Sequence, residues 1–192
     1  MDHYITQSGF GLRLRPLRVD DAEFILKLRC NPKLNRFINE TSPDIEVQKN
    51  WTRGYFQRKD DYYFCMELEK NGAPVGAVAI YNILDDLSKA EWGRWIVAPG
   101  VKAAPASAYL IYQIALEQMG LSLLYCRVVA DNLPVVSFHA SMGAERVGIL
   151  KNDAFIRGEH KDHVLFQVDR KRWKTIKPKA FEIASKTARF LD

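Results

Sequence analysis

The stretch 95-WIVAPGVKAAPAS-107, followed by the apolar run 109-YLIYQIALEQM-119, decides the fold of this chain. A β-branched strand passes through a turn of small residues into a long helix that is apolar on nearly all sides. Such a turn presents backbone amides at a helix N-terminus, where proteins bind phosphate groups. We therefore expect a strand, a phosphate-binding turn and a buried helix from about Pro105 to Met119, closed by Gly120.

Three antiparallel strands are predicted on the N-terminal side of this stretch. Residues 62–69 and 74–83 alternate around an Asn-Gly turn and predict a β-hairpin, and residues 90–98 form the third strand. On the C-terminal side, residues 123–130 are rich in β-branched side chains. A strand, a helix and a strand in succession predict a right-handed crossover onto a parallel neighbour.

The remaining pattern completes one α/β domain, which a chain of 192 residues with 47% hydrophobic residues can fill. It predicts a strand over 11–17, helices that begin at Asp20 and at Ser42, a short helix from Asn132 to Gly143, strands near 145–150 and 164–168, and an amphipathic helix over 179–191 whose apolar positions include Phe181.

No membrane span or secretory signal is expected. The longest apolar stretch, residues 106–116, is interrupted by Ser107 and Gln113, and the N-terminus lacks a basic start followed by an apolar run. We expect a cytoplasmic protein. The three cysteines stand far apart, and His160 and His163 lack further side chains at ligand spacing, so neither a disulfide nor a metal site is expected.

Basic residues are concentrated at the C-terminal end, because residues 170–192 contain eight Lys or Arg against two acidic residues. Solvated charge on a terminal helix is the commonest explanation of such a pattern. The segment also lacks interleaved aromatic residues, so no nucleic-acid partner is expected. We treat residues 1–173 as the domain and residues 174–192 as a basic helical extension, which could form a surface or a homodimer contact.

The order of elements carries a recognisable set of motifs. They are Val97-Ala98-Pro99, the segment from Lys102 to Ser107, and then Asn132, Val135, His139, Gly143 and Ala144. This set resembles the GNAT superfamily of acyl-CoA N-acyltransferases, in which V-x-P precedes R-x-x-G-x-G/A and a later helix carries N-x-x-(S/A)-x-x-x-Y-x-x-x-G-F. The resemblance implies an α/β fold with a mixed, mostly antiparallel, strongly bent sheet of about six or seven strands flanked by helices.

Two branches of that superfamily are similar over residues 11–173. Residues 158–166 and Trp173 resemble the closing strands of the ribosomal-protein acetyltransferases. Residues 28–51 resemble the amino-sugar-nucleotide N-acetyltransferases, such as those of pseudaminic acid synthesis. The resemblance implies acetyl-CoA as the co-substrate and a small-molecule amine, favoured as a nucleotide-linked sugar, as the acceptor.

The resemblance also implies which residues bind acetyl-CoA. The exposed backbone of Trp95, Ile96 and Val97 would pair with the pantetheine arm like an added strand, and one of those amides would serve as the oxyanion donor. Asn132 would lie beside the pantetheine, although it could simply cap its helix. The pyrophosphate would be held by Lys102 and by the amides of Ala103, Ala104, Ala106 and Ser107.

The chain departs from the family pattern at two positions. Pro105 stands where the family has a glycine, and proline has no N–H to offer a phosphate, although it is tolerated in the first turn of a helix. His139 stands where the family has the tyrosine that protonates the CoA thiolate. A histidine with an ordinary pKa can donate a proton at neutral pH, and the alternative is a helix histidine with no role.

The acceptor side is assigned from side-chain chemistry. Glu91 is the expected base, with a surface glutamate as the alternative. Tyr81 could bind an acceptor or belong to the core. Arg29, Asn35 and Arg36 could contact a nucleotide diphosphate, or form an ordinary solvated face.

Together these features predict an N-acetyltransferase that moves an acetyl group from acetyl-CoA to a primary amine, favoured as a nucleotide-linked amino sugar. A protein N-terminus or a small amine is the alternative acceptor. The substitution at Pro105 leaves a third possibility, a catalytically inert CoA-binding relative with a degenerate pyrophosphate loop.

Overall fold

Strands β3 (Asp61–Leu68) and β4 (Pro74–Tyr81) lie inside the fold, because nearly all of their side chains are buried. In β3, Phe64 and Met66 point to one hydrophobic core, whereas Tyr63 and Cys65 point to a second. Successive side chains of a strand face opposite sides of a sheet, so this sheet buries both of its faces. The computed structural model describes residues 3–191.

The sheet is open and mixed, with the order β1-β2-β3-β4-β5-β6-β8-β7. The predicted α/β class and mostly antiparallel sheet are confirmed, but the strand number is eight rather than six or seven. The three-residue strand β1, which pairs with β2 at the edge, was not predicted from the sequence. The other strands, besides β3 and β4, are β1 (Gln7–Gly9), β2 (Leu12–Pro16), β5 (Lys89–Val97), β6 (Leu123–Val129), β7 (Glu145–Ile156) and β8 (Glu159–Asp169).

The predicted crossover is confirmed, because β5 and β6 are parallel and are connected by a helix. Helix α3 (Ala104–Gln113) continues into the π-helical turn η3 (Ile114–Gln118), and Gly120 closes the segment with a φ of 75°. Seven consecutive side chains of α3, from Ala106 to Tyr112, are buried. The helix is therefore enclosed on nearly all sides, as its apolar pattern predicts.

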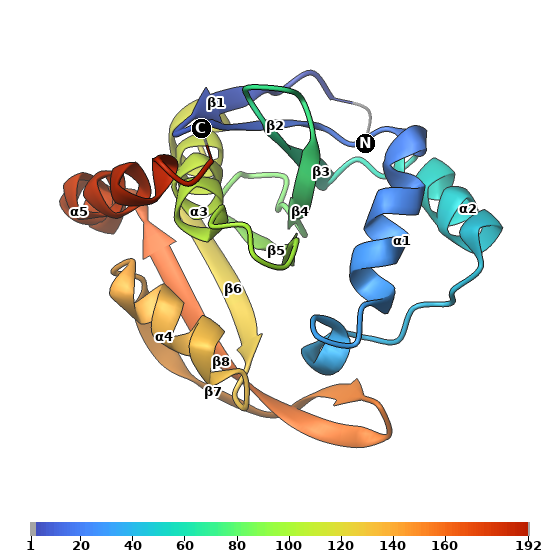
Figure 1. Cartoon of the computed structure of the whole chain (residues 1–192). Coiled ribbons are helices and arrows are strands. Elements are labelled where there is room, and N and C mark those ends of the chain that lie inside the picture. Colours follow the sequence, from blue (N-terminus) through green and yellow to red (C-terminus); the bar gives the residue numbers. More distant parts are fainter. Residues whose placement is uncertain (1–2, 192) are drawn as a thin grey trace.

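The helices cover the two faces of the sheet unequally (Figure 1). Helices α1 (Ala22–Cys30) and α2 (Ile45–Tyr55) lie together on one face and pack on the second core. Helix α2 begins two residues later than expected, because Asp44 rather than Ser42 accepts the capping hydrogen bond from the Glu46 amide. Helices α3, α4 (Leu133–Ser141) and α5 (Arg170–Ala188) pack on the first core.

Helix α5 begins nine residues earlier than the predicted helix and runs through Pro178 without interruption. It packs against α3, and its side chains Ala180 and Ala184 belong to the same core as the strands. Phe181, expected on the apolar face, is exposed. The helix thus crosses the proposed domain boundary at residue 174 as one continuous element of the fold.

The hairpin of β7 and β8 is about twice as long as the sequence pattern indicated, with strands of 12 and 11 residues. Its outer half carries mostly polar side chains, which obscured the strand signal. In Figure 1 this hairpin extends beyond the rest of the sheet and passes below the end of α1. Among residues 3–191, no helix combines the length and the apolar character that crossing a membrane requires.

Candidate active site

The sheet opens between β5 and β6. The two strands pair only from Lys89 to Glu91, and the rest of β5 is bonded to β4 alone. A cavity of about 170 Å³ occupies the opening and is lined by residues of both strands, from Trp92 to Trp95 and from Cys126 to Val129. The backbone of β5 beyond Glu91 thus faces a free edge, to which an extended ligand can add as a strand.

Trp95, Ile96 and Val97 lie on this free part of β5, as predicted. Asn132 lies across the same cavity, at the start of α4. Its carbonyl accepts hydrogen bonds from the amides of Val135 and Val136, but its side chain makes no capping bond. The Asn132 side chain is therefore available to a ligand in the opening.

The helix start supplies unpaired amides to the same end of β5. Within residues 3–191, the amides of Ala103, Ala104 and Ala106 have no protein acceptor, and Lys102 is exposed beside them. Amides at the first turn of a helix point away from the helix and attract anions. Three of the four predicted amides are thus unpaired, although Ala103 and Ala106 are fully buried and only Ala104 is half-buried.

The fourth predicted amide is committed elsewhere. The Ser107 amide donates to the Ala103 carbonyl at 2.9 Å and closes the first helical turn. Its hydroxyl accepts from the Trp95 indole N–H at 3.0 Å and lies 3.0 Å from the Ala104 carbonyl. Ser107 is also fully buried, so it joins the strand to the helix rather than facing a ligand.

Pro105 is the second residue of α3 and leaves a gap in the series of donors. The residues around it nevertheless fit a CoA pyrophosphate, because three free amides and the exposed Lys102 remain at the end of the free strand edge. The expected pyrophosphate site therefore lacks one amide donor but keeps its strand edge, helix start and basic side chain.

His139 lies deeper in the opening than its predicted role requires. It lines the smaller cavity, yet it is only 2% exposed and is surrounded by the rings of Trp92, Trp95 and Phe166 at 5.2 to 5.9 Å. Burial lowers the pKa of His139 to about 4. The imidazole is thus neutral at pH 7, and its predicted role as the proton donor remains a prediction.

Glu91 is also buried, and both of its carboxylate oxygens are occupied. Arg127 donates to each oxygen at 3.0 Å, Tyr81 donates its hydroxyl at 3.0 Å, and Asn82 donates at 3.2 Å. Burial, with the nearby Glu91 charge, raises the pKa of Tyr81, so its hydroxyl remains a donor. A proton taken up by Glu91 would disrupt these contacts, so they favour a positioning role, and its role as the base remains a prediction.

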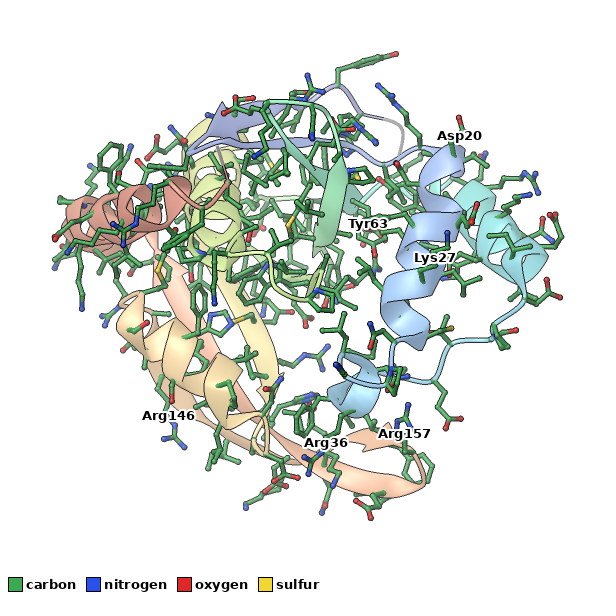
Figure 2. The ribbon with its side chains drawn as sticks, viewed as in Figure 1. Asp20, Lys27, Arg36, Tyr63, Arg146 and Arg157 are labelled. Carbon is green, nitrogen blue, oxygen red and sulfur yellow. The ribbon has the colours of Figure 1, made fainter. Side chains whose placement is uncertain are left out.

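A second, larger cavity of about 570 Å³ adjoins the first. Its walls come from α1, the segment between α1 and α2, α2, the central strands and the β7–β8 hairpin. Figure 2 shows Tyr63 in the space between the central strands and α1. Four residues line both cavities, so the two form one continuous site; they are Phe37, Ile38, Arg94 and His163.

Arg94 is the charged group at the junction that the sequence analysis missed. Its φ of 46°, at an irregularity in the β4–β5 pairing, is unusual for a residue other than glycine. Its Nη1 donates to the buried Asp61 at 2.6 and 2.8 Å, and its guanidinium lies 4.5 Å from the Tyr81 ring. Its Nε and Nη2 have no protein partner in the described chain, so they are free to bind an acceptor.

The predicted acceptor residues divide into two groups. Arg29 and Tyr81 line the larger cavity. Asn35 and Arg36 lie on the short helix η2 (Asn35–Phe37) but line neither cavity, and the Arg36 guanidinium lies over the Phe37 ring. Trp51, Arg58 and His163 line the larger cavity without having been predicted. They come from separate elements, and no local motif marks them.

This construction, a parallel pair of strands that separates beside an amide-rich helix start and leads into a second cavity, defines an acyl-CoA-dependent N-acyltransferase. The chain belongs to the acetyltransferase (GNAT) domain family, whose model matches residues 11–145. A search of curated proteins gave no match.

Solved structures agree with the family. Apo FdhC, a nucleotide-linked sugar GNAT, is 28% identical with a TM-score of 0.77, over 99% of this chain and 100% of its own. A GCN5-related N-acetyltransferase from Brucella melitensis is 18% identical, with a TM-score of 0.82 over 95% of this chain and 86% of its own. A mutant of spermidine N-acetyltransferase SpeG from Vibrio cholerae is 20% identical, with a TM-score of 0.74 over 86% and 97%.

Proposed function

We propose that this N-acetyltransferase moves an acetyl group from acetyl-CoA to the amine of a nucleotide-linked amino sugar. The observation that carries the proposal is the charge of the larger cavity. Three arginines, Arg29, Arg58 and Arg94, outnumber the carboxylates, which are Glu40 on the wall and the buried Asp61 paired with Arg58 and Arg94. Arginine binds phosphate oxygens through paired N–H donors, so such a wall favours an anionic acceptor.

Aromatic side chains of the same wall support a ring-shaped acceptor. Phe37, Trp51, Tyr63 and Tyr81 all line the larger cavity. Aromatic faces pack against sugar and base rings, and a cavity of about 570 Å³ is within the range of small-molecule sites. The likeness to FdhC, which is a nucleotide-linked sugar GNAT, points the same way.

The alternative acceptor, a small polyamine such as spermidine, fits the wall less well. A polycation is held by several carboxylates, whereas Asp61 is already paired with Arg58 and Arg94 and leaves Glu40 as the one carboxylate on the wall. The structural neighbour SpeG acts on spermidine, but at 20% identity its likeness extends to the fold alone.

For the donor, we propose that the free backbone of Trp95, Ile96 and Val97 holds the pantetheine arm, with Asn132 opposite. Lys102 and the three free amides of the helix start would hold the pyrophosphate. The bound thioester supplies the activated acetyl group. The chain would position the thioester and donate an amide of the β5 edge to the oxyanion. It would also hold the acceptor amine next to the thioester carbonyl.

The test is release of free CoA thiol from acetyl-CoA with three amines: a uridine or thymidine diphosphate-linked amino sugar, the same amino sugar without its nucleotide, and spermidine. We expect kcat/KM to be at least about 100-fold higher for the nucleotide-linked sugar, since each of its two phosphates would form an ion pair with an arginine of the cavity. Preference for spermidine, or equal rates for the two sugars, would overturn the proposed acceptor.

A further inference from the structure

We infer that His163, oriented by Asp153, is the base that removes the proton from the acceptor amine. This inference rests on the proposed transfer to an amine, but not on the identity of the sugar. It gives a role to a histidine of the β7–β8 hairpin that the sequence analysis considered only as a metal ligand.

The hairpin is irregular where the two side chains meet. Leu150 pairs with His163 and Ala154 pairs with Lys161, so three residues of β7 oppose the single Asp162 of β8. Asp162 fixes this bulge, because it accepts a hydrogen bond from the Asn152 amide at 3.0 Å and binds Lys151 at 2.6 Å. A bulge redirects the side chains that it contains, and here it directs Asp153 against His163.

The contact between the two side chains fixes the state of the imidazole. His163 Nδ1 lies 2.7 Å from Asp153 Oδ2, and the same carboxylate oxygen accepts from Arg127 at 3.1 Å. A carboxylate only accepts hydrogen bonds, so Nδ1 carries the proton and Nε2 carries the lone pair. His163 and Arg127 together lower the pKa of Asp153, which remains ionised as the imidazole becomes charged.

The position of His163 matches the place of reaction. Its side chain is 13% exposed and lines both cavities, where the donor and acceptor sites join. Nε2 has no protein partner within residues 3–191. Arg94 shares this junction but remains protonated at all working pH values, so His163 is the one junction residue that can accept a proton.

The two residues that the sequence predicted for proton transfer are less suitable. Glu91 has both oxygens in hydrogen bonds to Arg127, Tyr81 and Asn82. His139 is enclosed by aromatic rings and lines only the smaller cavity. Neither could meet an amine without rearrangement.

The proton transfer is balanced within the site. The acceptor ammonium gives one proton to His163 Nε2, which leaves a neutral amine and an imidazolium paired with Asp153. The amine lone pair forms the new C–N bond, the C–S bond breaks, and its electron pair leaves on the thiolate. The second proton of the attacking nitrogen passes to the thiolate, which gives a neutral amide and the free CoA thiol. The imidazolium then returns its proton to solvent.

Charged groups from several elements face His163. Asp153 on β7 contacts its imidazole directly. Those facing it from the other walls are Arg127 on β6, Glu91 and Arg94 on β5, Arg29 and Arg58 near the two N-terminal helices, and Glu40 between them.

The experiment compares His163→Gln and Asp153→Asn with His160→Gln, a control at an exposed histidine of the same strand. Each is assayed with whichever panel amine the wild type acetylates, so failure of the sugar proposal leaves this test intact. We expect His163→Gln to lower kcat about 100-fold at pH 7 with KM nearly unchanged. The deficit should shrink as the pH approaches the pKa of the amine, because less base is then required.

Asp153 is a positioning residue, and its signature lies in the pH profile. Asp153→Asn removes the charge that favours the imidazolium, so the acidic limb of kcat/KM should move to lower pH. His160→Gln should leave rate and profile unchanged. A normal rate in His163→Gln, or an equal loss at every pH together with lost acceptor binding, would overturn the inference.

A measurement without turnover covers the case in which a variant does not fold. Nitrogen-15 NMR of the wild-type protein should show His163 as the Nδ1–H tautomer when neutral. An Nε2–H tautomer would contradict the inference, since the lone pair would then face Asp153 instead of the cavity.

Discussion

The donor and acceptor sides of this active site are built by different means. The donor side uses backbone: a free strand edge from Trp95 to Val97 and three unpaired amides at the start of α3, over a floor of buried aromatic rings. The acceptor side uses side chains from α1, α2, β3, β5 and the β7–β8 hairpin, held by ion pairs such as that of Arg94 with Asp61.

This difference separates binding of the donor, which needs only backbone groups, from choice of the acceptor, which needs particular side chains. A strand edge and a helix start would bind pantetheine and pyrophosphate through backbone groups that every residue except proline possesses. Acceptor choice instead depends on which side chains the long hairpin and the N-terminal helices bring together. Substitutions on the two sides should therefore have separable effects, which the following predictions test in order of expected size.

The buried floor of the donor side should make folding sensitive to acid. Burial lowers the pKa of His139 to about 4 from its ordinary value of 6.5, so folding favours the neutral ring. This contribution is complete above pH 6.5 and is lost as the pH falls from 6.5 toward 4, by about 3 kcal/mol in total. Urea unfolding of wild type and His139→Leu between pH 7.5 and pH 4.5 should show a shallower pH dependence in the variant. The same pH dependence of the unfolding free energy in both proteins would mean that water reaches His139 in the folded state.

Glu91 should matter for stability more than for proton transfer. Glu91→Gln removes the ion pair with Arg127 that joins β5 to β6. Because Arg127 is 35% exposed and can be solvated, we expect a loss of about 2 kcal/mol in the free energy of unfolding, below the range for fully buried pairs. The shape of the pH–rate profile should be retained. The exposed Glu145→Gln serves as the control, and loss of the acidic limb in Glu91→Gln would return the base role to Glu91.

Arg94 should affect the acceptor alone. Arg94→Lys can retain the charge beside Asp61 but removes the free donor nitrogens Nε and Nη2. We expect kcat/KM for the nucleotide-linked acceptor to fall about tenfold, or about 1.4 kcal/mol, with the Kd of acetyl-CoA unchanged. Arg36→Lys, outside both cavities, is the control. An equal weakening of acceptor use and of acetyl-CoA binding would contradict the assignment of Arg94 to the acceptor side alone.

Pro105 should limit donor binding slightly. Pro105→Ala restores an amide at the second position of α3 without a glycine in the helix. We expect acetyl-CoA to bind about threefold more tightly, because a new charge-assisted hydrogen bond is offset by lost backbone rigidity. Titration calorimetry measures this, with Pro99→Ala outside the helix as the control. Weaker binding would show that the proline ring itself contacts the ligand.

The sequence predicted the strand and the helix of the proposed donor side because both elements are local. The order of strand, turn and helix within residues 90–119 fixes the free edge and the helix start, and both lie where expected. The exception was Ser107, whose amide closes the first helical turn. Which first-turn amides remain free depends on where the helix begins, and a pattern locates that point only to within a few residues.

The acceptor side could not be predicted in the same way. Arg29 and Tyr81 line the larger cavity, but their role in acceptor binding stays a prediction. The positions of Arg94 and His163 depend on a bulge in β5 pairing and a bulge in β7, which no periodicity marks. The length of the hairpin was also underestimated, because its outer half carries mostly polar side chains. Tertiary pairing, rather than local sequence, forms this half of the site.

The central claim is that two adjoining sites of different construction bind acetyl-CoA and an anionic nucleotide-linked acceptor at the same time. Titration calorimetry of thymidine diphosphate into the protein, alone and with saturating CoA, tests it most directly. The account predicts one diphosphate bound per chain in both cases, with a similar Kd, and weaker binding in Arg94→Lys. Displacement of the diphosphate by CoA, or no diphosphate binding at all, would contradict it.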